Sequence, residues 1–108
     1  MRLLYNTKVM QYFHQATYGN VGGVHTLQPQ MVMRGNAVYN TRYNPAGASA
    51  HPVFMVHDNQ MYRTAFHPEG KSEHPLYEIR GDKVHTTTFH PEHNATQHVF
   101  ELREHAHL

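Results

Sequence analysis

Hydrophobic and polar residues alternate in short runs along most of the chain, and these runs come in pairs. The two arms of each pair are rich in Val, Met, Tyr, Thr and Phe and are separated by two residues: Gly35-Asn36, Asp58-Asn59 or Gly81-Asp82. Such residues tolerate positive φ in two-residue turns. Because the arm residues favour strands over helices, the pattern predicts three β-hairpins.

The hairpins recur at a constant spacing of 23 residues. The same step separates equivalent residues in all three copies, namely Pro29, Pro52 and Pro75; Thr41, Thr64 and Thr87; Tyr43, Phe66 and Phe89; and Pro45, Pro68 and Pro91. A fixed internal period indicates one repeated supersecondary unit. We expect units near residues 29–51, 52–74 and 75–97, half units at 98–108 and 1–9, and an irregular segment at 10–28. Each unit ends in an eight-residue connector, at 44–51, 67–74 and 90–97.

Both chain ends resemble incomplete units. The segment 98–103 matches a first arm, and 4–8 matches a second arm. We expect these segments to pair, because pairing removes the exposed strand edges that invite aggregation. The sequence therefore predicts one all-β domain over residues 1–108. Its fold would be an antiparallel up-and-down barrel, or a blade-like ring, of about four to five hairpins, closed by its N- and C-terminal strands. Within the irregular segment, 12–17 is a further candidate strand.

Counting outward from the turns assigns each side chain to one face of the sheet. One face is apolar and is expected to form the core: Leu4, Met31, Met33, Val38, Phe54, Val56, Met61, Tyr77, Ile79, Val84, Phe100 and Leu102. Burial of large apolar side chains, at about 1.5–3 kcal/mol each, would be the main stabilising term.

The opposite face carries columns of Tyr, Thr and Arg. Tyr and Arg are favoured at binding hot spots, so the candidate binding residues are Tyr39, Tyr62, Arg34, Arg80 and His57. A second interpretation is cross-strand packing that only stabilises the sheet. A third turns this face inward as the polar lining of a ligand-holding barrel.

Composition narrows the class of protein. The chain has no Cys and a net charge of +1, so it offers neither a disulfide framework nor a strong field for nucleic acid. Arg34, Arg80 and Arg103 recur beside aromatic residues, but Glu78 and Glu101 interrupt the same rows, which disfavours a nucleic-acid platform. We expect a cytoplasmic protein, because no apolar run suggests a signal peptide or a membrane span.

Histidine is the most over-represented residue, with 12 copies. Imidazole is a common metal ligand, but the repeat exchanges His67 and His90 with Asn44 at one position. Asn retains the hydrogen-bonding capacity of His without its metal affinity. We therefore expect these side chains to hold connector backbone groups, with no metal site and no cofactor.

One pair of residues suggests acid–base chemistry. Glu78 falls directly across from His85 in the third hairpin, and a Glu–His pair in a partly dry cavity could transfer protons. No Gly-x-Ser-x-Gly elbow or phosphate-binding glycine loop is present in the sequence.

The favoured function is a non-enzymatic binding or protein-interaction module. It would act through the Tyr/Thr/Arg face or through a cavity beneath the connectors, and it would self-associate as a homo-oligomer. The alternative is a small barrel enzyme or ligand-binding barrel that uses Glu78 and His85. The 23-residue period equals that of membrane-occupation-and-recognition-nexus repeats. Their regular Tyr/Gly pattern is missing, so no family is assigned.

Overall fold

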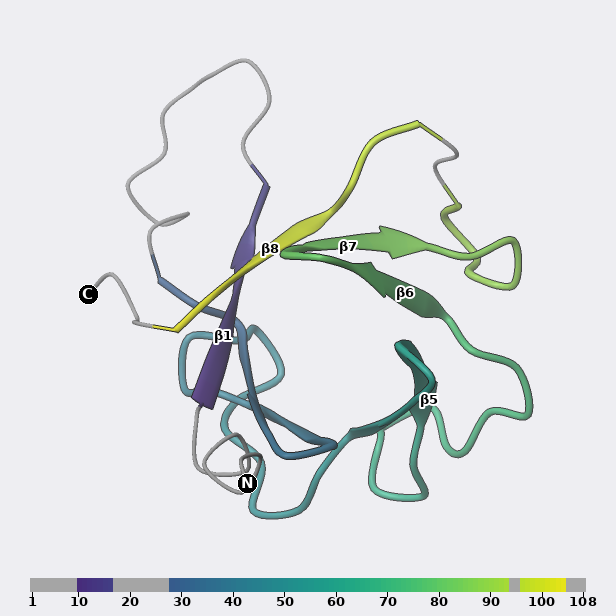
Figure 1. Cartoon of the computed structure of the whole chain (residues 1–108). Coiled ribbons are helices and arrows are strands. Elements are labelled where there is room, and N and C mark those ends of the chain that lie inside the picture. Colours follow the sequence, from purple (N-terminus) through teal and green to yellow (C-terminus); the bar gives the residue numbers. More distant parts are fainter. Residues whose placement is uncertain (1–9, 17–27, 94–95, 105–108) are drawn as a thin grey trace, which may run out of the picture.

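The computed structural model describes residues 10–16, 28–93 and 96–104, and its regular structure there is entirely β-strand (Figure 1). The eight strands are β1 (Met10–Gln15), β2 (Met31–Arg34), β3 (Ala37–Asn40), β4 (Phe54–His57), β5 (Gln60–Arg63), β6 (Tyr77–Arg80), β7 (Lys83–Thr86) and β8 (Phe100–Arg103). No helix in the described part of the chain is long and apolar enough to cross a membrane.

The strands form one closed antiparallel barrel in sequence order, and β8 returns to pair with β1. Figure 1 shows this closure where the yellow β8 crosses the purple β1. An all-β barrel with paired first and last strands was the primary expectation and is confirmed, whereas the blade-like ring is not formed. Closure leaves no free sheet edge among the eight strands.

The strand that closes the barrel differs from the one expected. β1 lies in the segment predicted to be irregular, overlapping the candidate strand at 12–17. The expectation that 4–8 pairs with 98–103 is wrong, because β8 already uses one edge for β7 and the other for β1. Residues 4–8 themselves lie outside the described residues. The 23-residue spacing does not predict β1, because no two-residue turn motif precedes it in the sequence.

The three tight turns are formed as predicted. Arg34 pairs with Ala37, His57 with Gln60, and Arg80 with Lys83, leaving two residues in each turn. In the middle hairpin both turn residues have positive φ, 53° at Asp58 and 64° at Asn59, as in a type I′ turn. The outer two hairpins place Gly35 and Gly81 at the first turn position, with φ of 63° and 62°.

The core is a layered stack of side chains inside the barrel. The four largest fully buried side chains, Phe13, Val38, Met61 and Val84, come one from each odd-numbered strand. Their cross-strand partners on the even-numbered strands are Leu102, Met33, Val56 and Ile79. A second layer, at the connector end, contains Met31, Phe54, Tyr77 and Phe100. The apolar face therefore points inward, and the interpretation of an inward polar lining is wrong because these side chains already fill the interior.

Most of the expected core residues belong to this cluster or pack against it. The exception is Leu4, which lies outside the described residues. Phe13, Val53 and Leu76 are buried but were not expected. Val53 and Leu76 directly precede β4 and β6, whose first residues, Phe54 and Tyr77, also pack in the core. The alternation of buried and exposed residues therefore fails where the connector enters the sheet.

A threonine at the end of each odd-numbered hairpin strand anchors the following connector. Thr41, Thr64 and Thr87 each donate from Oγ1 to the carbonyl of the proline 12 residues earlier, at 2.6 Å. The same hydroxyls accept the backbone N–H two residues later, at 3.1–3.2 Å. The threonine columns of the outer face are therefore occupied by structural hydrogen bonds. They hold the connectors in position over one end of the barrel.

Candidate ligand-binding site

The connectors enclose a two-lobed depression at their end of the barrel, called the mouth cleft here. One lobe, of about 340 Å³, is lined by Phe54, Arg63, His67, Glu69, Leu76, Tyr77, His90, Pro91 and Glu92. The other lobe, of about 370 Å³, is lined by Gln30, Met31, Asn40, Asn44, Pro45, Ala46, Phe54, His67, Pro68, Glu69, Tyr77 and Phe100. Four residues, Phe54, His67, Glu69 and Tyr77, line both lobes, so the lobes adjoin.

Aromatic rings of the second core layer, at the connector end of the barrel, form the floor of the mouth cleft. Tyr77 meets Phe54 and Phe100 edge to face, at centroid distances of 5.6 and 5.9 Å. Edge-to-face contacts of this kind are favourable beyond area burial. The floor is therefore part of the packed core.

Two histidines from successive connectors stand over this floor. The His67 ring meets Phe54 at 5.2 Å, and the His90 ring meets Tyr77 at 5.0 Å, both edge to face. Nδ1 of His67 accepts the N–H of Glu69 at 3.0 Å, and Nδ1 of His90 accepts the N–H of Glu92 at 2.9 Å. At the equivalent position Asn44 Oδ1 accepts the N–H of Ala46 at 2.9 Å. These bonds explain the Asn–His exchange, as the sequence predicted.

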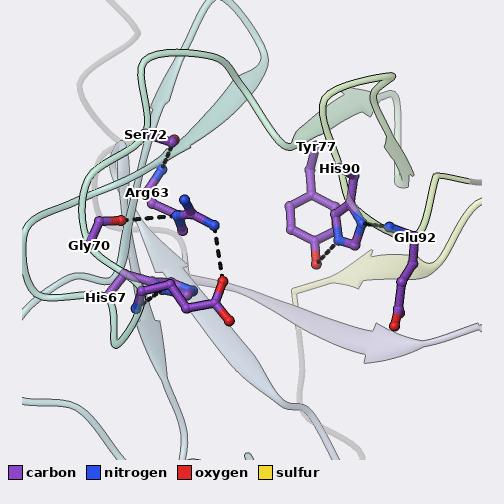
Figure 2. A network of polar contacts seen from close by, with 8 residues as sticks. Arg63, His67, Gly70, Ser72, Tyr77, His90 and Glu92 are labelled. Carbon is purple, nitrogen blue, oxygen red and sulfur yellow. Dashed lines mark hydrogen bonds and ion pairs between the residues drawn. The ribbon is translucent and has the colours of Figure 1, made fainter.

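The backbone bonds fix the tautomers of both histidines. Because Nδ1 accepts a hydrogen bond, the single proton of the neutral ring resides on Nε2. His90 therefore donates from Nε2 to the Tyr77 hydroxyl, 3.1 Å away (Figure 2). The Tyr77 hydroxyl proton is consequently available for another acceptor.

Burial tunes the titration of these groups. Desolvation, followed by the charge of Arg63, lowers the pKa of His67, while Glu69 opposes the shift. Desolvation also lowers the pKa of His90, against the opposing charge of Glu92. Both rings are therefore neutral at pH 7. Burial, with a further contribution from Glu92, raises the pKa of Tyr77, so its hydroxyl stays protonated.

An arginine and two glutamates set the charge of the mouth cleft. Arg63 donates from Nη1 to Glu69 at 3.1 Å and from Nε to the Gly70 carbonyl at 2.9 Å (Figure 2). Its backbone N–H is bound by Ser72 Oγ at 2.9 Å. Glu92 has no side-chain ion pair among the residues that the structure describes. With Arg63 and Glu69 neutralising one another, the rim retains one negative charge.

The residues expected to bind a partner lie elsewhere, on the outer face. Arg34 stacks over the Tyr39 ring at 5.5 Å, His57 lies 3.5 Å from Asp58, and Tyr62 is paired with Met55 across the β4–β5 hairpin. Arg80 is occupied by Glu78. These side chains are spread over β2 to β6 and form no common pocket in the described part of the chain.

Glu78 and His85 are cross-strand partners, as the register predicted. The carboxylate of Glu78, however, accepts from Arg80 at 3.1 and 3.3 Å, and no hydrogen bond joins it to His85. Desolvation, together with Arg80 and His98, lowers the pKa of His85. His14 and Glu101 form a second Glu–His register pair in the β1–β8 junction. Sequence reasoning missed this pair because β1 was not placed.

Glu101 accepts hydrogen bonds from two further side chains. His98 donates to it at 3.0 Å and Arg103 at 2.8 Å, and these bonds lower the pKa of Glu101. The His85 and His98 rings are 6.0 Å apart. Within residues 10–16, 28–93 and 96–104, no group of three or more His, Asp or Glu side chains has the geometry to hold a metal ion.

Comparison with known proteins does not assign this barrel. The chain matches no protein-family model, and neither the curated proteins nor the solved structures show significant similarity to it. Its function is therefore argued from the site itself.

Sequence reasoning anticipated a cavity beneath the connectors but did not identify its lining residues. The available signal was the column Asn44, His67 and His90, one position before the second proline of each unit. The roles of Arg63 and Tyr77 could not be found this way, since each occurs in only one copy of the repeat, whereas Glu69 recurs as Glu92.

Proposed function

We propose that this protein is a small non-enzymatic binding module whose ligand site is the mouth cleft. The observation that carries the proposal is a concave, two-lobed surface with an aromatic floor and a few fixed polar groups. Small-molecule sites commonly combine these features, and the mouths of β-barrels are common places for them. Among the described residues, the interior below the cleft is packed with the buried side chains Phe13, Val38, Met61 and Val84.

The histidines of the mouth cleft are better placed to orient a ligand than to transfer a proton. A general base needs a free lone pair within reach of its substrate. In both His67 and His90 the lone pair of the neutral ring accepts a backbone N–H. His67 presents a positioned Nε2–H donor, while His90 uses its Nε2–H to position the Tyr77 hydroxyl, and both arrangements favour binding over acid–base catalysis.

Native mass spectrometry of untagged protein, mixed with a cell-extract metabolite fraction, tests the proposal. We expect a small organic molecule bound one to one. Ala46→Trp should abolish this adduct, because Ala46 is exposed and lines the cleft without contributing a side-chain bond. Ala50→Trp is the matched control, being exposed on the same connector but outside the lining. Equal adducts in both variants would place the ligand elsewhere.

A protein-interaction role for the outer face is the second candidate. Met55, Phe66 and Phe89 are large apolar side chains with exposures of 42%, 58% and 52%. Phe66 and Phe89 lie in the turns after β5 and β7, stacked on His51 and His74. Met55 lies on β4, on the outer face that carries the binding candidates Tyr39, Tyr62, Arg34, Arg80 and His57. Self-association through this face would give a homo-oligomer. Sedimentation analysis of wild type and of Met55→Lys checks it: a monomeric wild type would reject self-association.

The catalytic alternative uses Glu78 to orient or deprotonate His85. It predicts that Glu78→Gln abolishes turnover of any substrate found for the protein. A binding module predicts only a mild change in affinity, because Glu78 lies outside the lining of the mouth cleft.

We also infer that the barrel consists of four equivalent hairpin units, the fourth formed jointly by β8 and β1. The recurring threonine bonds and the equivalent buried positions of Phe13, Val38, Met61 and Val84 support this inference.

A further inference from the structure

The polar groups that face the mouth cleft are of two opposite kinds. On the floor and directly above it, the proton of the Tyr77 hydroxyl and the Nε2–H of His67 are hydrogen-bond donors. Neither donor has an acceptor among the described residues. In that part of the chain, the only bond of the Tyr77 hydroxyl is the one that its oxygen accepts from His90, and the only bond of the His67 ring is the one that Nδ1 accepts from the Glu69 N–H. Buried or half-buried donors of this kind favour a ligand that presents acceptor oxygens to them.

The rim, in contrast, offers acceptors. One oxygen of Glu69 is bound by Arg63, which leaves the other oxygen available, and the Glu92 carboxylate has no side-chain partner in the described part of the chain. Carboxylates of this kind accept hydrogen bonds from ligand hydroxyl or amine groups.

The charge of the cleft excludes several ligand classes. An anionic phosphate or carboxylate would be repelled by the net negative rim, whose field reaches the floor, since Glu92 contributes to the raised pKa of Tyr77. A cation would pair with Glu92 at the rim, but it would leave the hydrogen-bond donors of Tyr77 and His67 without an acceptor. A neutral ligand whose groups both donate and accept satisfies floor and rim together, and hydroxyl groups do both.

The shape of the cleft adds a second constraint. Its floor is aromatic and apolar, with Phe54, Leu76 and Tyr77, so the ligand also needs a face of C–H groups. The adjoining lobes, of about 340 and 370 Å³, each lie within the size range of small-ligand sites. Together they suit an extended ligand more than a single compact ring.

We propose that the mouth cleft binds a neutral saccharide, with a disaccharide spanning its two lobes. Tyr77 and His67 donate to ring or hydroxyl oxygens, Glu69 and Glu92 accept from hydroxyl groups, and the apolar face of a sugar ring packs over Tyr77. This assignment rests on the proposed function of the mouth cleft and names its ligand class.

Isothermal titration with glucose, galactose, mannose, maltose, cellobiose and lactose tests the assignment. At least one of the neutral disaccharides should bind more tightly than the monosaccharides. Glucose 6-phosphate should bind more weakly than glucose, because of the negative rim. Tighter binding of the phosphate would overturn the charge argument, and binding of no neutral saccharide would overturn the assignment.

Variants with matched controls locate the contact. Tyr77→Phe retains the ring of the floor and should weaken disaccharide binding about tenfold. Tyr12→Phe makes the same change on β1, outside the lining of the cleft, and should leave affinity unaltered. Likewise Glu92→Gln should weaken binding several-fold, whereas Glu73→Gln, on an exposed connector residue outside the lining, should not. Equal effects within either pair would contradict the proposed contacts.

Two-dimensional ¹H–¹⁵N NMR of the wild-type protein separates the two levels of the proposal and does not depend on any variant folding. Other small molecules shifting the amides around the mouth cleft, without any response to saccharides, would reject the saccharide and retain the binding site. Saccharide-induced shifts confined to the outer face would reject both.

Discussion

Individual side chains in this protein act mainly by holding backbone groups that no strand partner satisfies. The hydroxyl of Thr64 bonds the Pro52 carbonyl and the Phe66 N–H, and the His67 ring bonds the Glu69 N–H. Leaving such buried groups without a partner is costly. Residues that resembled an adhesive or metal-binding set in the sequence are therefore largely explained by connector structure.

Thr64→Val should destabilise the fold by about 1–3 kcal/mol, because an isosteric methyl group replaces both hydrogen bonds of the hydroxyl. Thr88→Val is the control: Thr88 is exposed and forms no hydrogen bond among the described residues, so its effect should stay within about 0.5 kcal/mol. Urea unfolding measures both. Equal destabilisation in the two variants would show that the Thr64 hydroxyl has no special role.

Acid should weaken the fold between about pH 7 and pH 5. The folded-state pKa values of His67, His85 and His90 lie below the ordinary value of about 6.5, so the unfolded chain binds protons first as the pH falls. Stability is therefore fully present above the unfolded pKa and declines below it. His67→Asn should flatten this dependence, since Asn can accept the Glu69 N–H as Asn44 accepts that of Ala46. An unchanged slope in thermal melts across this pH range would contradict the account.

At the scale of elements, the hairpins were predictable and the connectors were not. Each hairpin can be recognised in the sequence by its two-residue turn and by the alternation of apolar and polar residues in its arms. The cross-strand partners of Met33, Val56 and Ile79 therefore followed from counting outward from the turn. Where a connector enters a strand, Val53 and Leu76 are buried although the next residue also packs in the core. Counting alternate positions therefore fails to predict their burial. The mouth cleft combines connector residues with residues at the ends of strands, so its lining depended on tertiary structure that the period does not encode.

Gly81→Ala should destabilise the third hairpin by about 1–2 kcal/mol. The cost is conformational, because φ at Gly81 is 62° and a Cβ there would meet nothing within 4 Å. Gly81→Asn should cost less, since Asn tolerates this conformation. Chemical denaturation of the three proteins should rank them Gly, Asn, Ala, and a more stable Ala variant would contradict the turn geometry.

For the whole molecule, the deciding event is the pairing of β1 with β8, which converts a row of hairpins into a closed barrel. The sequence predicted closure from the matching ends, but it selected the wrong N-terminal segment, because β1 has neither the turn nor the prolines of the repeat. Phe13 of β1 nevertheless occupies the same core layer as Val38, Met61 and Val84. The indication of β1 in the sequence was a large apolar residue, Phe13, within the segment predicted to be irregular.

Phe13→Ala should destabilise the whole barrel by about 3–5 kcal/mol, because Phe13 is fully buried opposite Leu102 and packs edge to face on Phe100 at 5.8 Å. Met10→Ala, on the exposed end of the same strand, should cost less than about 1 kcal/mol. Hydrogen exchange should show the loss in β3 and β5 as well as in β1 and β8. Loss confined to β1 would show that closure is not required for the rest of the sheet.

The central claim is that the mouth cleft is the ligand site of a binding module. The most direct measurement is amide chemical-shift mapping of the wild-type protein against a chemically diverse set of small molecules. Binders should shift the amides around His67, Tyr77 and His90, while those of the tight turns at Gly35, Asp58 and Gly81 should stay fixed. Shifts gathered on the outer face over Tyr39 and Tyr62, or no binder at all, would contradict it.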